Sequence, residues 1–217
     1  MVERLREKVN YFSAKTGKFY QLVPTRTVPV LKINAVPMHR FAKIDPLRDA
    51  ELKVKCLRPR GEVLDVCTGL GYSAIQEAMQ EGVTSVVTVE KDPEVIEMAR
   101  INPSSSELFS NPKIRIVEGD AFCIINDFSD ESFGAVLHDP PTFVVAPELY
   151  HADFYRQLYR VLARGGRLWH YAPEPGKAGK KGKNVRFVEG IIKRLKAAGF
   201  DGLNHDPASS GITGTKR

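Results

Sequence analysis

The chain has 217 residues, 42% of them hydrophobic and 27% charged, which suffices for one folded domain and excludes a small disulfide scaffold or a disordered chain. The three cysteines form no C-x-x-C pair, no apolar run could span a membrane, and the charged N-terminus is unlike a signal peptide, so we expect a cytoplasmic protein without a metal site. The net charge of +6 hides an asymmetry, because Lys and Arg exceed Asp and Glu by 14 to 5 in residues 1–60 and 10 to 4 in residues 174–217, but are outnumbered 8 to 17 in residues 61–173. Two basic flanks predict a polyanionic partner, although solvated basic faces are the simpler interpretation.

Residues 1–60 are predicted to form a basic N-terminal extension. Alternating apolar residues interrupted by prolines indicate short edge strands within 18–23 and 28–33. A helix is expected from Pro46 to about residue 57. We place the boundary of the main domain, 61–217, after this extension.

From residue 61 onward, short apolar runs alternate with segments of helical period, which predicts an α/β fold built on a parallel sheet. The predicted strands are 62–67, 84–90, 113–118, 133–138 and 167–172. The predicted helices are 73–81, 93–101, 148–163 and 186–198. Two final strands, 200–205 and 211–216, would form a hairpin, and the Gly/Lys-rich segment 173–183 is predicted to be a mobile loop.

A strand, a glycine turn and a helix follow one another between residues 64 and 74. Gly69 and Gly71 would let the backbone approach a ligand, and Glu90, at the end of the next strand, would accept hydrogen bonds from both hydroxyls of a ribose. This spacing also fits a NAD-dependent dehydrogenase. Asp65 distinguishes a site for NAD from a site for a cationic ligand such as S-adenosylmethionine. Its carboxylate would repel the pyrophosphate of NAD and attract the cationic ligand. The alternative role for Asp65 is to cap a neighbouring element.

The same segment resembles motif I of class I S-adenosylmethionine-dependent methyltransferases, with Cys67 standing where many members have glycine. The resemblance implies a Rossmann-like fold, a mostly parallel seven-stranded sheet with helices on both faces, and S-adenosylmethionine as cofactor. Asp120 matches the position that accepts a hydrogen bond from the adenine amine, although it could equally cap a helix. The cofactor-binding residues that we expect are Asp65, Thr68, Gly69, Leu70, Gly71, Tyr72, Glu90, Lys91, Asp120 and Ala121.

The fourth predicted strand ends in a segment that resembles the (Asn/Asp/Ser)-Pro-Pro-aromatic motif of methyltransferases acting on exocyclic base amines. Asp139 and the carbonyl of Pro140 would accept the two N–H bonds of a planar, weakly nucleophilic amine and orient its nitrogen, while Pro141 would stiffen the turn. Thr142 replaces the usual aromatic residue, so we expect Phe143 or Tyr171 to stack on the base. A plain strand-ending turn is the alternative. For the preceding His138, core packing is favoured over catalysis.

Residues 61–205 resemble a class I methyltransferase core as a whole. The segments 38–40, 45–49, 90–95 and 100–109 are similar to a family of archaeal predicted methyltransferases that includes a small-subunit ribosomal-RNA cytidine N4-methyltransferase, whose product is N4,N4-dimethylcytidine. This implies an RNA N-methyltransferase acting on cytidine N4. RNA contacts are then expected from Thr142, Phe143, Tyr171, Arg40, Lys180 and Lys181.

Two other functions remain open at this point. An aminopropyltransferase of the spermidine synthase type would share the fold, although the basic flanks and Pro140-Pro141 argue against it. An RNA-binding assembly factor with a vestigial cofactor pocket is the other, although the acidic residues expected at the cofactor and the substrate are all present. The sequence predicts neither the target nucleotide nor the oligomeric state.

Overall fold

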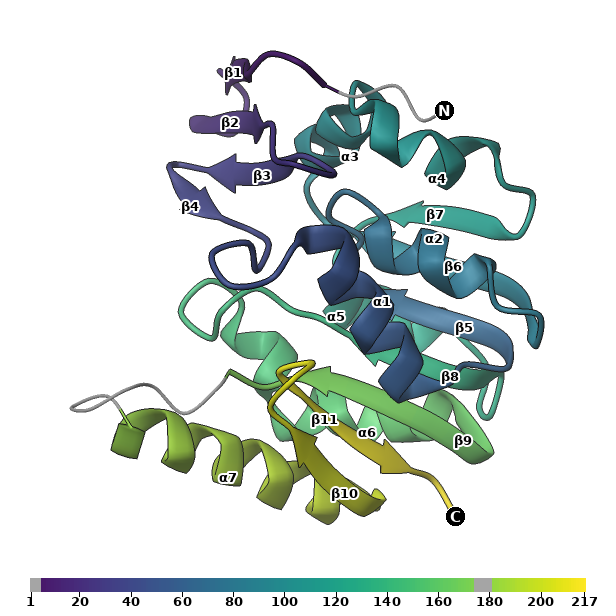
Figure 1. Cartoon of the computed structure of the whole chain (residues 1–217). Helices are drawn as coiled ribbons and strands as arrows, with labels where there is room; N and C mark the ends of the chain where they lie inside the picture. Colours follow the sequence, from purple (N-terminus) through teal and green to yellow (C-terminus); the bar gives the residue numbers. More distant parts are fainter. Residues whose placement is uncertain (1–4, 174–180) are drawn as a thin grey trace.

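The computed structural model describes residues 5–173 and 181–217, and in these ranges it contains two sheets (Figure 1). The larger sheet has seven strands in the order β10-β11-β9-β8-β5-β6-β7. Strands β5 to β9 are mutually parallel, whereas β11 is antiparallel to β9 and β10. Their bounds are β5 (Gly61–Val66), β6 (Val83–Glu90), β7 (Ile114–Glu118), β8 (Phe133–His138), β9 (Leu162–Tyr171), β10 (Asp201–Asp206) and β11 (Gly211–Thr215). The predicted mostly parallel seven-stranded sheet and its C-terminal hairpin are thus confirmed.

Helices cover both faces of this sheet. Four pack on one face, namely α1 (Pro46–Leu57), α2 (Tyr72–Ala78), α3 (Pro93–Arg100) and α4 (Ser106–Ser110). The other face is covered by α5 (Ala121–Ile124), α6 (Ala152–Val161), α7 (Lys181–Ala198) and the short turns η2 (Ile125–Asp127) and η3 (Pro147–Tyr150); the turn η1 (Pro103–Ser105) leads into α4. Helices α1 and α3 both start with an Asp cap followed by proline, because the carboxylate accepts backbone N–H groups that have no partner within the helix.

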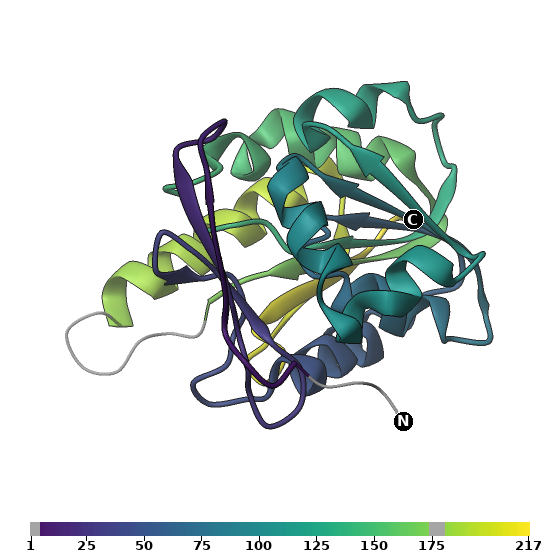
Figure 2. The ribbon, with the colours of Figure 1, turned by 90° about the horizontal axis from the view of Figure 1, so that it is seen from above.

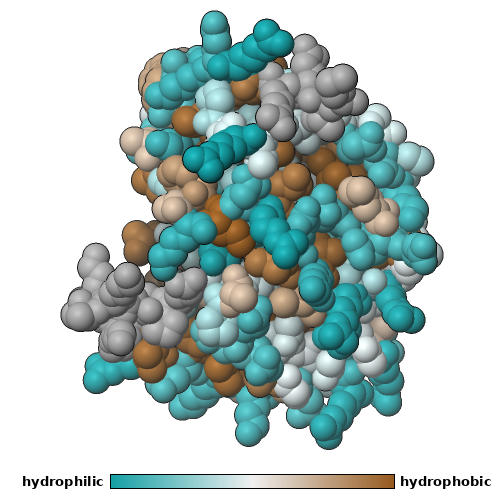
Figure 3. Space-filling model, viewed as in Figure 1, coloured by the Kyte–Doolittle hydropathy of each residue, from teal (hydrophilic) through white to brown (hydrophobic). Residues whose placement is uncertain are grey.

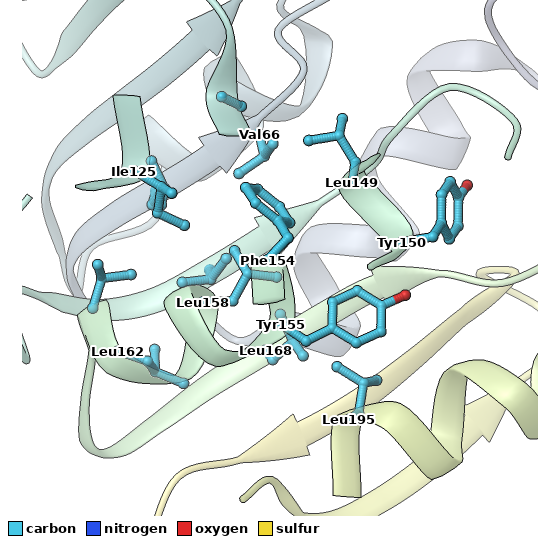
Figure 4. Packing of buried hydrophobic residues seen from close by; sticks show 14 of the residues in the cluster. Val66, Ile125, Leu149, Tyr150, Phe154, Tyr155, Leu158, Leu162, Leu168 and Leu195 are labelled. Atoms are coloured by element: carbon cyan, nitrogen blue, oxygen red, sulfur yellow. The ribbon is translucent and has the colours of Figure 1, made fainter. Parts of the chain in front are cut away.

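The two hydrophobic cores meet at the central strands. In β5, Val63 points to the α1–α2 side and the adjacent Leu64 to the α6 side, and both are buried, as expected for a parallel strand covered on both faces. On the α6 side, Phe154, Tyr155 and Leu158 project from the helix onto β8 and β9 (Figure 4). The apolar face of α6 is therefore covered by the sheet, while its polar face remains in water.

The smaller sheet comprises β1 (Val9–Ser13), β2 (Lys18–Val23), β3 (Val30–Ile33) and β4 (Val36–Pro37), all antiparallel. It lies beside the carboxyl ends of the parallel strands, to the left in Figure 1 and again in the view of Figure 2. Polar contacts attach it to the start of α3. Lys18 Nζ lies 2.9 Å from Asp92, and the Tyr20 hydroxyl donates to the same carboxylate at 2.8 Å.

Several element boundaries differ from those predicted. The expected helix 148–163 is divided into η3 and α6 because His151 has an extended backbone and caps α6 through its ring. Strand β9 then starts at Leu162, five residues before the predicted strand. Helix α7 starts at Lys181, so residues 181–183 are helical where a loop was predicted, and residues 174–180 of that loop lie outside the described residues. Strands β1 and β4 were not predicted.

The core on the α6 side provides a test of this packing. Leu158 is fully buried against β8 and β9, so Leu158→Ala removes methyl groups and leaves a cavity. We expect a loss of about 2–5 kcal/mol in the free energy of unfolding, measured by urea denaturation. Met79→Ala, at a site 67% exposed, is the control and should change stability by no more than about 0.5 kcal/mol. Equal effects of the two substitutions would contradict the assigned core.

Candidate active site

The candidate site lies where the strand order reverses, between β5 and β8. The loops after β5 and β8 leave the sheet in opposite directions there, which creates a crevice at the carboxyl ends of the strands. The Asp139 N–H donates to the Val66 carbonyl at 3.3 Å and so links the two loops at their origin. An open groove of about 940 Å³ between the ends of α1 and α2 lies at the amino ends of the strands, away from this crevice.

Glu90 organises the glycine loop after β5. One of its oxygens accepts the Gly69 N–H and the other accepts the Asp92 N–H, both at 3.0 Å. Gly69 has φ +55 with open space where a Cβ would stand, and Gly71 has φ +78 with a Cβ position only 2.6 Å from Leu108. The backbone conformation favours glycine at both positions, Gly71 also lacks space for a Cβ, and the loop leaves room for a ligand at Gly69. Burial raises the pKa of Glu90.

Asp65 lies beneath this loop, fully buried. One carboxyl oxygen accepts the Thr88 hydroxyl at 2.6 Å, and Thr88 in turn is 2.6 Å from the Thr68 hydroxyl. No described residue hydrogen-bonds to the other oxygen. Burial raises the pKa of Asp65 to about 7. A buried carboxyl with an unused oxygen suits the ammonium group of S-adenosylmethionine, so the residues present fit this cofactor.

Cys67 has φ +75, a left-handed conformation that is strained for any residue other than glycine. Its N–H and that of Thr68 both donate to the Val89 carbonyl, at 3.0 and 3.1 Å, and these bonds hold the conformation. Burial raises the pKa of the Cys67 thiol well above its ordinary value, which makes the thiol unreactive. The structure therefore explains why glycine is common at this position.

The other predicted cofactor residues divide into two groups. Asp120, at the carboxyl end of β7, caps α5 through the Phe122 N–H at 3.0 Å and also pairs with Lys91 at 2.6 Å, so the capping interpretation holds. Ala121 next to it is buried in the core on the α6 side. By contrast, the side chains of Leu70 and Tyr72 are buried in the α1–α2 core, and the Tyr72 hydroxyl donates to the Pro29 carbonyl at 2.8 Å. Their contribution to a cofactor is limited to the backbone.

Asp139 is held by a chain of alternating charges that the sequence did not reveal. Its carboxylate lies 2.6 Å from Lys53 Nζ, Lys53 lies 2.8 Å from Asp49, and Asp49 lies 2.6 Å from Arg40. Lys53 is only 8% exposed. Burial by itself would lower the pKa of Lys53, but the adjacent carboxylates of Asp139 and Asp49 raise it, so this lysine stays protonated. Arg40, expected at the RNA, has its guanidinium on Asp49.

The turn after β8 places the predicted substrate residues at different depths. Pro140 is buried, and the Pro141 carbonyl accepts the Tyr150 hydroxyl at 2.9 Å, which fixes the turn. Thr142 is exposed, and Phe143 is 48% exposed with its ring edge-to-face against Tyr150. Either residue can meet a substrate. Tyr171 is half-buried, and burial together with the Asp139 charge raises the pKa of its hydroxyl.

His138 packs in the core, in accord with the favoured interpretation. Its ring lies 4.5 Å from that of His170, and both rings are buried. Burial lowers the pKa of His170 to about 4 and that of His138 well below its ordinary value, so both rings are neutral. Neither reaches the crevice as an acid or base.

Three further expectations concern the lysines predicted to contact RNA, a metal site and a membrane span. Lys180 and the side chain of Lys181 lie outside the described residues. Within the described ranges, no group of three or more His, Cys, Asp or Glu side chains is placed to hold a metal ion. In the same ranges, no helix combines the length and apolar character needed to cross a membrane.

The residues that sequence reasoning missed are Asp49, Lys53 and Thr88. Asp49 and Lys53 are four residues apart in α1, a spacing typical of helical ion pairs, and this was the available signal. Nothing in the sequence indicated that Lys53 also contacts Asp139, which is 86 residues away. Thr88 lies in a mostly apolar strand, so its pattern did not indicate a polar contact with Asp65.

Comparisons with known proteins bear on this site. A family model described as a methyltransferase domain matches residues 63–166. The protein MJ1233 of Methanocaldococcus jannaschii is 43% identical over 200 residues, which cover 91% of this chain and 67% of that protein. Polyamine aminopropyltransferase 2 of Streptomyces coelicolor is 32% identical over 116 residues, or 51% of this chain and 21% of that enzyme.

Among solved structures, the spermidine synthase of Thermotoga maritima superimposes with a TM-score of 0.72 at 17% identity, covering 95% of this chain and 70% of that one. At this level of identity the likeness concerns the fold alone. The family model spans the glycine loop, Glu90, Asp120 and the Asp139 turn, which are the elements that form the crevice. The chain belongs to the same family as MJ1233, and its residues 63–166 match a methyltransferase domain, in accord with an S-adenosylmethionine-dependent enzyme.

Proposed function

We propose that this domain methylates an exocyclic amine of an RNA base, and specifically cytidine N4 in small-subunit ribosomal RNA. The observation that carries the proposal is the Asp139 carboxylate, fixed 2.6 Å from Lys53 at the end of β8 and joined through its backbone to the strand that precedes the glycine loop. The basic N-terminal extension and C-terminal flank supply charge for the phosphates of RNA.

The chemistry required of the protein is orientation. When bound, S-adenosylmethionine supplies an electrophilic methyl group. Asp139 and the Pro140 carbonyl accept the N–H bonds of the amine and thereby increase electron density on its nitrogen. A base must leave its stack to reach this turn, which favours single-stranded or loop RNA. The small, exposed Thr142 leaves room beside the amine for one methyl group, which supports a second transfer to the same nitrogen.

Aminopropyl transfer is the second candidate, because the matches to an aminopropyltransferase and a spermidine synthase favour it. Its acceptor, a polyamine, carries ammonium groups at neutral pH and needs unpaired carboxylates. In this chain Asp139 is already paired with the buried Lys53 ammonium, which would repel a cationic acceptor. The neutral amine of a nucleobase has no such penalty, so the electrostatics of the turn support the base.

A direct experiment separates these candidates. The purified protein is incubated with S-adenosylmethionine and ribosomal RNA from a strain lacking the gene, and nucleosides are analysed by mass spectrometry. In parallel it is incubated with decarboxylated S-adenosylmethionine and putrescine. We expect N4-methylated and N4,N4-dimethylated cytidine from the first reaction and no product from the second. Spermidine formation, or methylation at a ring nitrogen or carbon, would overturn the proposal.

Asp65 gives the cofactor site a pH-dependent stability. Its pKa is raised in the folded protein, so ionisation opposes folding, and its stabilising contribution is lost as pH rises through about 7. We expect Asp65→Asn to be more stable than the wild type at pH 8, to lose less stability between pH 5 and 8, and to bind S-adenosylmethionine more weakly.

Urea denaturation at both pH values and calorimetry of S-adenosylmethionine binding measure these effects. Glu81→Gln, which neutralises an exposed carboxylate, is the matched control. Identical pH dependence of stability in Asp65→Asn and the wild type would show that Asp65 is already ionised in the folded protein.

The ion pair at Asp139 makes a second prediction. Lys53→Met should lower the rate of methyl transfer at least tenfold with unchanged affinity for S-adenosylmethionine, and Lys53→Arg should recover part of the rate, because a charged partner is restored. Asp139→Asn should keep measurable activity, since an amide oxygen still accepts an N–H bond, whereas Asp139→Ala should have none.

Single-turnover assays measure these rates, and thermal melting verifies that each variant folds. If Asp139→Asn is slower than the wild type by about 10²–10⁴, then Asp139 takes up the proton rather than only orienting the amine.

A further inference from the structure

The N-terminal sheet has two faces of different character. Strand register places Tyr11 opposite Tyr20 and Leu22 opposite Leu31 on one face, and Tyr20 and Leu22 belong to the core below. The alternate residues lie on the opposite face of the sheet, on which Phe12 and Phe19 are exposed and Gln21 is only 9% exposed. We call these Asn10, Phe12, Phe19, Gln21 and Lys32 the outer face of the sheet.

The outer face carries two large aromatic rings on its surface. Phe12 and Phe19 are direct cross-strand partners, and they are 62% and 37% exposed. Adjacent to them, Asn10 accepts a hydrogen bond from Gln21 at 2.8 Å. Neighbouring phenylalanines left in water on a well-paired sheet cost free energy, which marks them as a surface for a partner.

Two lysines lie on either side of this aromatic pair along the sheet. Lys15 is exposed in the turn that joins β1 to β2, and Lys32 is the cross-strand neighbour of Gln21. Lys32 Nζ also lies 5.8 Å from the centre of the Phe41 ring, which is 42% exposed. The view in Figure 3 shows apolar residues reaching the surface over β4, between hydrophilic ones.

The outer face also continues toward the candidate active site. Phe41, which extends this face beyond β4, follows Arg40, and Arg40 begins the chain of ion pairs through Asp49 and Lys53 to Asp139. The sheet itself stands beside the carboxyl ends of the parallel strands (Figures 1 and 2). A polymer lying on this face would therefore run beside the end of the main sheet at which the Asp139 turn lies.

We propose that the outer face is a stacking platform for single-stranded RNA next to the target base, with Phe12 and Phe19 each receiving one base and Lys15 and Lys32 contacting phosphates. This rests on the proposed function. Aromatic rings interleaved with amides and lysines match a nucleic acid, which offers flat rings and charged phosphates in alternation. A second copy of the chain fits less well, because the cores of protein interfaces are depleted in lysine.

The test uses a fluorescein-labelled single-stranded RNA 12-mer, the full-length protein and fluorescence anisotropy at several salt concentrations. The Phe12→Ala/Phe19→Ala variant should bind at least fivefold more weakly at each salt concentration, with an unchanged slope of log affinity against log salt, because phenylalanine carries no charge. Lys32→Ser should lower this slope by about 0.7.

Two control variants accompany this test. The Phe12→Trp/Phe19→Trp variant retains stacking and should keep wild-type affinity, and Met79→Ala removes an exposed apolar side chain elsewhere. Wild-type affinity in Phe12→Ala/Phe19→Ala would overturn the platform while leaving the proposed function intact. Failure of the wild type to bind the RNA would overturn both. A dimer in sedimentation that is lost in this variant, with RNA affinity unchanged, would assign the face to a second copy.

Discussion

The arrangement of the site depends on the parallel pairing of β5 with β8. Val66 lies opposite His138, so the two strands end at the same level and the glycine loop and the Asp139 turn begin side by side. Both strands are buried on both faces, which leaves their ends little freedom to move. Residues more than 60 positions apart in the chain are therefore held in fixed relation by backbone hydrogen bonds.

Buried charge is handled in two ways at this edge of the sheet. Asp139, Lys53, Asp49 and Arg40 alternate in sign, so each buried charge has a partner that offsets its loss of hydration. Among the residues that the structure describes, none forms an ion pair with Asp65 or with the fully buried Glu77, and burial raises the pKa of both carboxyls. The paired group keeps its charge for chemistry, whereas the unpaired groups remain responsive to a cation that binds nearby.

The fold was largely predictable because hydrophobic period and capping are local signals. The helix from Pro46 to Leu57 was predicted correctly from its proline start, and the five parallel strands were predicted from short apolar runs that alternate with segments of helical period. Strands β1 and β4 were not predicted because they are short and mostly exposed. The Lys53–Asp139 pair was not predicted because only tertiary packing brings α1 to the end of β8. Glu90 and Asp65, in contrast, were identified from the sequence because each has a fixed spacing from the glycine turn after β5.

Asp92 has a consequence for how this chain can be divided. Its carboxylate caps α3 and also accepts hydrogen bonds from Lys18 and Tyr20 of the small sheet, while its N–H binds Glu90, which supports the glycine loop. One residue thus connects the N-terminal strands to the loop beneath the crevice. Residues 1–60 differ from the main domain in charge, yet their strands are bonded to the residue that supports the glycine loop. A shortened chain starting at residue 61 would also lose α1, and with it the Lys53 partner of Asp139. The main domain alone therefore lacks part of the candidate active site.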